Sequence, residues 1–400
     1  MHNFRLVRRL NLHFSLLWAL FWGSYASLWS YRTVFLLHHG FTNSQIGLVS
    51  SLALLLPMAV QPLLSSLAGR SHRATSRALA MALTALSMVC CAGIWLFDHD
   101  TVYSVLLIVI GVALTVTVPY FNAMSMEFVM RGVDLNFGAS RSCGSVSFSV
   151  VSLVMGAALE RFAPTLTLPV FLVFSGALLL ALLLFRYPLP EISGQQAKDE
   201  PAALSNAALL RRYPRFALML AACFLLVCSQ MTLSTFMIQI AGKVGGGESV
   251  TGTAYFLSSI VELPAMVLFA KVRRKIPLRT LLFISAAFFT VRAACFLVAG
   301  STPVIYLACV LQFFAYALLA IATVYYVTEE LDTANQAKGQ ALIYLVPSGM
   351  GAAFGTLCGG WLLDLGGVDT LLLFCVLTAA AGTAVMAPAL YPKHPKGAKR

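Results

Sequence analysis

The chain has 400 residues, of which 59% are hydrophobic and only 10% are charged, and its formal net charge is +12 at pH 7. Because soluble globular proteins carry about 25% charged residues, this composition excludes a soluble domain and indicates a polytopic membrane protein.

Apolar runs of roughly 20 residues, separated by charged or turn-forming clusters, predict twelve membrane-spanning helices. In chain order the predicted spans are 11–38, 45–69, 77–97, 102–130, 137–160, 166–186, 214–241, 250–270, 279–299, 303–328, 338–363 and 370–391. The predicted fold class is an all-α membrane protein with twelve transmembrane helices in two pseudo-symmetric six-helix bundles.

The basic residues gather on one side of these spans. Only Arg161 and Lys243 fall in the opposite loops, and Arg32 and Arg292 lie within spans, which leaves 23 of the 27 basic residues on the side of the termini. Because Lys and Arg collect on the cytoplasmic side, both termini are predicted to be cytoplasmic. The positive charge thus reflects topology, and we expect no nucleic-acid partner.

A polar segment divides the chain in the middle. The predicted domains are an N-terminal bundle, 1–186, a cytoplasmic linker, 187–213, and a C-terminal bundle, 214–400, with a short basic tail. The linker has the composition of a flexible tether. Two equal bundles on either side of a midplane site allow alternating access, which predicts a transporter.

Ionisable side chains inside the apolar spans are the first candidates for function, because each costs at least about 2.5–3.5 kcal/mol to insert. They are Arg32, Glu127, Arg141, Glu262 and Arg292. The short turn 131–136 brings Glu127 and Arg141 to similar depth, so they can form a charge pair. Glu262 lies near the middle of its span and is the predicted proton-coupling group, with Arg292 as its neighbour. As alternatives, the Glu127–Arg141 pair only holds the cytoplasmic gate closed, and Glu262 and Arg292 form a permanent salt bridge that only holds two helices together.

Polar residues in the same spans are further candidates. Pro264 predicts a kink in span 8 that exposes Glu262, with a kink that serves only packing as the alternative. Gln312 and Tyr316 are four residues apart, so they are expected on one helical face, where they can bind a polyhydroxyl solute. Weaker candidates, for which interhelical hydrogen bonding is the alternative, are Asn122, Gln230, Gln239 and Tyr325.

Span 11 is rich in glycine. Gly351, Gly355 and Gly359 share one helical face and predict the close approach of another helix. Both a sliding seam between the two halves and a static interface are compatible with this pattern.

Other chemistry has little support in the sequence. The nine cysteines lie in apolar spans without Cys-x-x-Cys spacing, and no Gly-rich loop with Lys-Ser/Thr is present. We therefore expect no cofactor, no metal site and no enzymatic activity, and we expect transport to be driven by a gradient. The chain has no Asn-x-Ser/Thr acceptor, which fits a bacterial cytoplasmic membrane.

Several short motifs resemble those of the major facilitator superfamily, in the branch that contains lactose permease, the nucleoside and phenylpropionate permeases and the sugar efflux transporters. They are Gly40-Phe41 with Ser44-Gln45-Ile46-Gly47, Gln61-Pro62-Leu63, Phe137-Gly138-x-x-Arg141-x-x-Gly144-Ser145, Glu262-Leu263-Pro264-Ala265-Met266, Val291-Arg292 and Leu311-Gln312-Phe313. The resemblance implies that Arg141 pairs with Glu127 and contacts substrate hydroxyls. It also implies that Phe148 replaces a tryptophan on which the sugar ring stacks, with ordinary packing as the alternative.

The chain departs from this branch at two places. Where lactose permease has the histidine and glutamate of proton translocation, this chain has Gln312 and Ala315. In the superfamily's loop between spans 2 and 3, Ser65 and Gly69 replace a glycine and an aspartate, which leaves three arginines as gating candidates, Arg70, Arg73 and Arg77. In the second half, the basic stretch 271–275 has Glu329, Glu330 and Asp332 as expected partners, with lipid anchoring as the alternative.

The sequence thus predicts a secondary transporter of a sugar, oligosaccharide or nucleoside, driven by protons or by exchange. The expected partners are a small-molecule substrate, protons and membrane lipids, and the expected state is a monomer. A first-half site of Glu127, Arg141, Phe148 and Asn122 and a second-half site of Glu262, Arg292, Gln312 and Tyr316 are expected. The alternatives are a sugar or drug exporter and a non-transporting membrane sensor.

Overall fold

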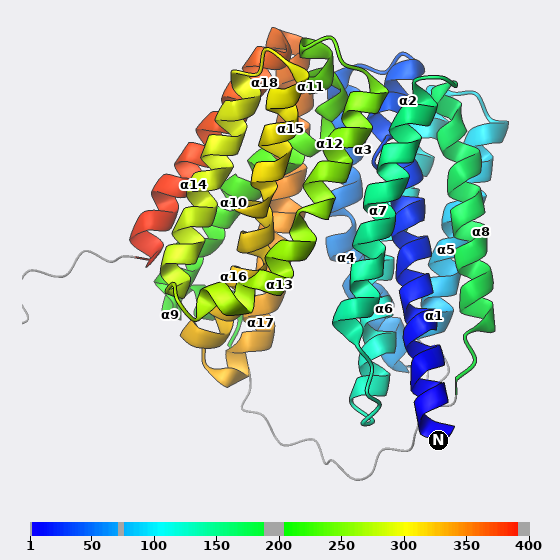
Figure 1. Ribbon diagram of the computed structural model, residues 1–400, viewed down its shortest axis with the longest axis vertical. Coiled ribbons are helices and arrows are strands. Elements are labelled where there is room, and N and C mark those ends of the chain that lie inside the picture. Colours follow the sequence, from blue (N-terminus) through cyan, green and yellow to red (C-terminus); the bar gives the residue numbers. More distant parts are fainter. Residues whose placement is uncertain (1, 71–75, 188–203, 391–400) are drawn as a thin grey trace, which may run out of the picture. The chain divides into compact units, whose positions relative to one another are not determined.

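The structure is a computed structural model that describes residues 2–70, 76–187 and 204–390. These residues are almost entirely helical (Figure 1). They fall into two compact units, of which unit 1 comprises Met1–Lys198 and Gly245–Ile260 and unit 2 comprises Asp199–Val244 and Val261–Arg400. Arg73, most of the predicted linker and the basic tail lie outside the described residues.

Unit 1 contains the predicted spans 1 to 6 and the first part of span 8. Its helices are α1 His2–Ser24, η1 Tyr25–Trp29, α2 Arg32–His38, α3 Asn43–Leu55, α4 Pro57–Arg70, α5 Ser76–Leu96, α6 Asp100–Val129, α7 Phe137–Leu159, η2 Pro164–Leu166, α8 Thr167–Leu184 and α12 Glu248–Ile260.

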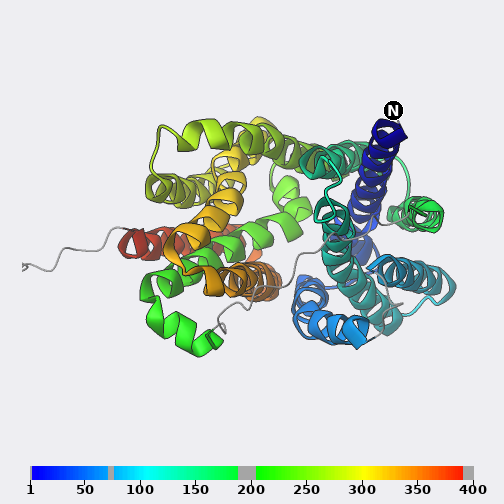
Figure 2. The ribbon, with the colours of Figure 1, turned by 90° about the horizontal axis from the view of Figure 1, so that it is seen from below.

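Unit 2 contains the remaining spans and a short helix before span 7. Its helices are α9 Asn206–Arg212, α10 Pro214–Thr235, α11 Met237–Lys243, α13 Glu262–Arg273, α14 Leu278–Leu297, α15 Thr302–Val310, η3 Leu311–Phe313, α16 Tyr316–Glu330, α17 Thr333–Ile343, η4 Tyr344–Gly351 and α18 Ala352–Leu390. Figure 2 shows the helices of each unit close to end on.

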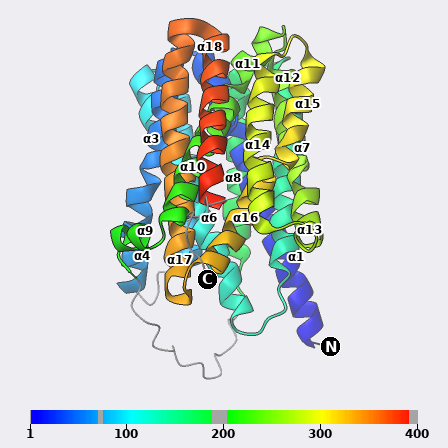
Figure 3. The ribbon, with the colours of Figure 1, turned by 90° about the vertical axis from the view of Figure 1, so that its left-hand side faces the viewer.

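Ten segments of the described chain are long and apolar enough to cross a membrane. One of them, Thr333–Leu390, reverses direction at Gly367 and so supplies two passes (Figure 3). Gly367 has φ 72° and ψ −168°, which only glycine adopts without strain. Together with the α1–η1–α2 segment, the described residues therefore supply twelve passes, as the hydropathy pattern predicts.

Several spans are interrupted where the sequence removes a backbone hydrogen bond. Proline has no N–H group, so Pro264 leaves the carbonyl of Ile260 without its helical donor. Helix α12 ends at Ile260 and α13 begins at Glu262, so the interruption of span 8 lies where Pro264 removes this donor. Span 2 breaks in the same way at Leu56, directly before Pro57. In span 11, Pro347 lies inside the π-helical turn η4.

Glycines allow close helix packing within each unit. A Cβ added to Gly144 on α7 would lie 3.2 Å from the Trp18 carbonyl of α1. In unit 2, a Cβ on Gly351 would lie 2.6 Å from the Phe224 carbonyl of α10, and one on Gly355 would lie 2.3 Å from the Cys228 carbonyl. The glycine face of span 11 therefore packs against α10 of its own unit, as a close-packed interface.

The last part of the predicted linker is docked onto unit 2. Helix α9 buries Leu209 completely, and the backbone N–H of Leu204 donates to Asn335 Oδ1 at 3.0 Å. Arg212 Nη2 and the Tyr213 hydroxyl donate to Asp332 Oδ2 at 3.0 and 2.6 Å. The expectation of a flexible tether is therefore wrong for residues 204–213, because these polar contacts fix the segment against α17.

Charges at the same end of unit 2 are paired. Arg273, in the basic stretch 271–275, donates to Glu329, and Arg279 Nη2 lies 2.8 Å from Glu330 Oε1. Of the three expected acidic partners of the stretch 271–275, Glu329 pairs with it, whereas Glu330 pairs with Arg279 outside the stretch and Asp332 pairs with Arg212. The Arg273–Glu329 and Arg279–Glu330 pairs are partly exposed, so each contributes at most about 1 kcal/mol to stability.

Candidate functional site

A chain of hydrogen bonds joins Arg292 to Glu262 in unit 2. The Arg292 guanidinium donates through Nη1 to Gln230 Oε1. Gln230 Nε2 donates to Gln312 Oε1 at 3.1 Å, and Gln312 Nε2 donates to Glu262 Oε1 at 2.9 Å. We call these four residues the relay. The two charges predicted to be neighbours are therefore linked through two neutral amides.

The direction of the relay follows from its cationic end. Arginine can only donate, so the Gln230 oxygen must face Arg292 and its amide nitrogen must face Gln312. The same reasoning directs the Gln312 nitrogen toward Glu262. Glu262 is therefore the acceptor, an arrangement that is strongest when its carboxyl group is ionised, because charge-assisted hydrogen bonds are about twice as strong as neutral ones.

Burial makes the relay hard to rearrange. Arg292 is 2% exposed, Gln312 is 4% exposed and Gln230 is 5% exposed, whereas Glu262 is half-buried. Arg292 Nε also donates to the Ala308 carbonyl at 3.0 Å. The cationic end is thus enclosed by protein, and the carboxyl end is the more accessible one.

Interrupted helices carry the accessible end of the relay. Glu262 is the first residue of α13, where the partial positive charge of a helix N-terminus favours a carboxylate. Val261, directly before it, is also the point at which the chain passes from unit 1 to unit 2. Gln312 lies in η3, a 3₁₀ turn between α15 and α16. Broken membrane helices of this kind form the substrate and ion sites of secondary transporters.

The break in span 10 also corrects one expectation. Ala315 has φ −86° and ψ −96°, so the helix does not continue from Gln312 to Tyr316, and the two side chains do not share one continuous helical face. The Ala315 carbonyl accepts from the Ser285 hydroxyl on α14 at 2.7 Å and from the Leu319 N–H of α16 at 3.1 Å. Tyr316 begins α16 and is half-buried.

In unit 1, Arg141 lies over an aromatic ring. Its guanidinium carbon is 5.1 Å from the centre of the Trp18 ring, within the range of a cation–π contact. The pairing of Arg141 with Glu127 on α6 stays a prediction. The Trp18 ring is one of the contacts of Arg141 within this unit.

Phe148 belongs to a cluster of three half-buried rings. Its ring centre is 6.1 Å from that of Trp22 and 6.2 Å from that of Tyr25, and the latter two are 5.1 Å apart. The sequence reasoning missed Trp22 and Tyr25 because it looked for charges. The signal was present, since Trp18, Trp22, Tyr25 and Trp29 follow one another at spacings of four, three and four, which places aromatic rings along one face of span 1.

The other candidates of unit 1 have separate surroundings. Asn122 Oδ1 is buried and has no hydrogen-bond partner among the described residues, which is unusual for a buried amide oxygen. Arg32 Nε donates to the Ser50 hydroxyl at 2.9 Å, and its Nη1 donates to the Trp29 carbonyl at 2.7 Å, so it joins spans 1 and 2. Arg77 donates to the Leu182 and Leu183 carbonyls at 2.7 and 2.9 Å, at the end of α8.

The remaining candidates carry less information. Arg70 is the last residue of α4, and Arg73 lies outside the described residues. Within the described part of the chain, no group of three or more His, Cys, Asp or Glu side chains is arranged to hold a metal ion.

Known proteins of similar sequence or structure are transporters. The chain is 26% identical over 386 residues to the maltose permease of Geobacillus stearothermophilus, and the match covers 93% of each chain. Its fold is similar to the crystal structure of the nucleoside transporter NupG, with a TM-score of 0.76 and 18% identity over 95% of this chain and 97% of the other. It is also similar to a bacterial homologue of the human lysosomal transporter Spinster, with a TM-score of 0.65 and 14% identity over 96% and 95% of the two chains.

The sequence profile of one family covers almost the whole chain. It is described as the MFS_1 like family, and it matches residues 11–374. This match and the folds of the solved transporters confirm the predicted resemblance to the major facilitator superfamily. The chain is a multi-pass membrane protein that belongs to the MFS_1 like family.

Proposed function

We propose that this protein is a secondary transporter of a sugar, an oligosaccharide or a nucleoside. The observation that supports this proposal most directly is the relay, because it presents an ionisable carboxyl group and an amide at the breaks of two membrane helices. Hydroxyl-rich solutes need such mixed donors and acceptors. The names of the similar proteins, a maltose permease and a nucleoside transporter, point to the same class of cargo.

In this proposal, a solute hydroxyl donates to Glu262 and displaces the Gln312 amide or shares the carboxylate with it. Arg141, Phe148 and Asn122 in unit 1 are the other proposed substrate contacts. The three-ring cluster offers an apolar surface to the face of a sugar or a base, and Arg141 offers several donors in a fixed plane.

Glu262 is also the proposed proton-coupling group. It is half-buried and follows the break at Val261, where the chain passes between the units. Protonation removes its charge and weakens the hydrogen bond from Gln312, so the state of the carboxyl group is tied to the conformation of the broken helices. The proposed setting is a bacterial cytoplasmic membrane, with both termini in the cytoplasm and the protein as a monomer.

The test measures internal pH and solute uptake in proteoliposomes. A panel of sugars, nucleosides, aromatic acids and cationic drugs is applied to wild-type protein and to the Glu262→Gln variant. A solute-triggered pH change in the wild type that is lost in Glu262→Gln supports both the cargo class and the coupling group. Uptake of a sugar or nucleoside without any pH change supports the cargo and refutes proton coupling.

The same experiment measures substrate binding by Glu262. Replacing a charge-assisted hydrogen bond by a neutral one loses about 1–2 kcal/mol, which corresponds to about a 5- to 30-fold rise in the KM for exchange. The Glu329→Gln variant is the matched control, because Glu329 pairs with Arg273 outside the relay.

Export is the second candidate function, favoured by the Leu311-Gln312-Phe313 and Glu262-Leu263-Pro264 motifs, and it predicts that uptake occurs only into inside-out vesicles.

A further inference from the structure

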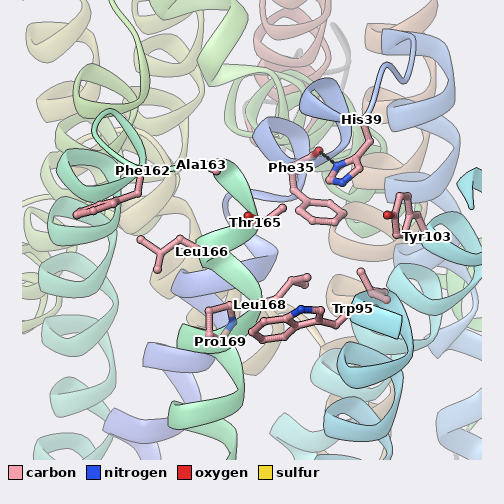
Figure 4. A pocket seen from close by; sticks show the side chains of 11 residues that line it. Phe35, His39, Trp95, Tyr103, Phe162, Ala163, Thr165, Leu166, Leu168 and Pro169 are labelled. Atoms are coloured by element: carbon pink, nitrogen blue, oxygen red, sulfur yellow. Dashed lines mark hydrogen bonds between the residues drawn. The ribbon is translucent and has the colours of Figure 1, made fainter. Parts of the chain in front are cut away.

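A pocket of about 430 Å³ lies in unit 1, away from all the candidate site residues. It is at the end of the unit opposite the N-terminus, where α2, the end of α5, the start of α6 and the start of α8 meet (Figure 4). Its lining includes Phe35, Trp95, Tyr103, Phe162 and Leu168. This volume falls within the range of about 300–1,000 Å³ that is typical of small-molecule sites.

The helices on either side of the pocket present apolar side chains to the outside. Val89 on α5 is 69% exposed, and Val173 on α8 is 71% exposed. In a membrane-spanning helix such residues face lipid chains. Trp95 and Phe162, at the helix ends that border the pocket, are 60% and 63% exposed, which matches the aromatic residues that line membrane interfaces. Exposed apolar side chains therefore border the pocket.

Two polar groups of the lining, those of His39 and Tyr103, are engaged within the protein. His39 Nδ1 hydrogen-bonds the Phe35 carbonyl at 2.8 Å, as the dashed line in Figure 4 marks. The Tyr103 hydroxyl donates to Asp98 Oδ1 at 2.7 Å. The His39 ring packs against those of Phe35 and Tyr103, with ring centres 4.4 and 4.7 Å apart. A polyhydroxyl solute would find few hydrogen-bond partners here, whereas an alkyl chain needs none.

We propose that this pocket binds an acyl chain of a membrane glycerophospholipid. With the proposed topology, the lipid belongs to the leaflet on the side opposite the termini. The occupant is a lipid and not the transported solute, because most of the lining residues are apolar and the exposed rings of Trp95 and Phe162 are among them.

Lipid retention provides the first test. The purified full-length protein is equilibrated with phosphatidylcholine in detergent, and the bound phospholipids are counted by native mass spectrometry. Thr165 lines the pocket, so Thr165→Trp fills it, whereas Val173→Trp adds the same ring to the exposed face of α8 outside the pocket. We expect Thr165→Trp to lose one retained phospholipid per protein and Val173→Trp to keep it. Equal retention by the two variants would overturn the proposal.

Fluorescence provides a second test that does not fill the pocket. Vesicles with increasing fractions of phosphatidylcholine brominated on its acyl chains quench tryptophans that contact those chains. Trp95 and Trp361 are similarly exposed, at 60% and 66%, but only Trp95 lines the pocket. The fluorescence of each tryptophan is obtained as the difference between the wild type and the Trp95→Phe or Trp361→Phe variant. The fluorescence of Trp95 should be quenched at a lower mole fraction of brominated lipid than that of Trp361.

An experiment with maltose distinguishes a lipid site from a second binding site for the transported solute. If maltose shifts the Trp95 emission in detergent and added phosphatidylcholine does not, the pocket is a solute site and the lipid assignment is wrong. If the two tryptophans are quenched in parallel, Trp95 contacts only bulk lipid, and the proposal is equally refuted.

Discussion

Gln230 is the residue on which the relay depends most, because it accepts from a buried cation and donates to a second amide. Replacing Gln230 by leucine removes the acceptor of Arg292 Nη1 and the donor of Gln312 Oε1. Arg292 is 98% buried, so water cannot replace the lost contact without a structural change. The Ala308 carbonyl remains as its neutral partner.

The size of the effect follows from these contacts. Leaving the Arg292 Nη1 donor without its acceptor costs about 1–3 kcal/mol, and an unsatisfied amide oxygen on Gln312 adds about 1–3 kcal/mol. A domain is stable by only about 5–15 kcal/mol, so Gln230→Leu should lower the thermal midpoint strongly. In Gln230→Leu/Arg292→Met the buried charge is absent as well, and the double variant should be at least about 1 kcal/mol more stable than Gln230→Leu alone.

The assay is thermal unfolding in detergent of the wild type, the two single variants Gln230→Leu and Arg292→Met, and the double variant. Unfolding is monitored by the reaction of a thiol-specific dye with the buried cysteines as they become exposed. Gln340→Leu serves as the control, because the Gln340 amide donates only to the Val324 backbone carbonyl at the surface. It should change stability by about 0.5–1.5 kcal/mol. If the double variant loses as much stability as the two single variants together, Gln230 and Arg292 do not interact and the relay is wrong.

Three further predictions concern packing, binding and docking. Gly355→Ala places a Cβ against the Cys228 carbonyl and should cost about 1–3 kcal/mol, whereas Gly242→Ala meets no atom within 4 Å and should cost nothing, as thermal midpoints will measure. Phe148→Ala removes one ring of the three-ring cluster and should raise the exchange KM about 2- to 10-fold, and an unchanged KM would leave Phe148 as a packing residue. Asp332→Ala breaks the contacts of α9, so limited proteolysis should cut residues 204–213 faster than in the wild type, and equal rates would show that α9 docks without Asp332.

The number and position of the spans could be predicted because hydropathy reports directly on the solvent of each segment. The predicted span 102–130 corresponds to α6, Asp100–Val129, and the break of span 8 follows from the missing N–H of Pro264. Both features depend on residues that act locally. For this reason a single sequence was sufficient for them.

The site was predicted less completely because it depends on contacts between distant residues. Glu262, Arg292 and Gln312 were chosen individually, but the bridging role of Gln230 requires the depth and rotation of α10, which hydropathy does not specify. The break at Ala315 could not be predicted, because no proline lies near it in the sequence. The docking of α9 was missed because this short helix follows a polar segment and was counted with it as linker; its buried Leu209 is the signal that was overlooked.

The glycine contact of η4 and the first part of α18 with α10 holds these helices at a fixed separation, which can serve as an internal reference distance. Because the Gly351 and Gly355 positions leave no room between the two backbones, these helices can shift relative to each other only by losing their contact. Leu218 on α10 and Trp361 on α18 are exposed, at 41% and 66%, and accept spectroscopic labels without disturbing this contact. A label pair at these positions should report one constant distance throughout the transport cycle, against which distances to any other label can be calibrated.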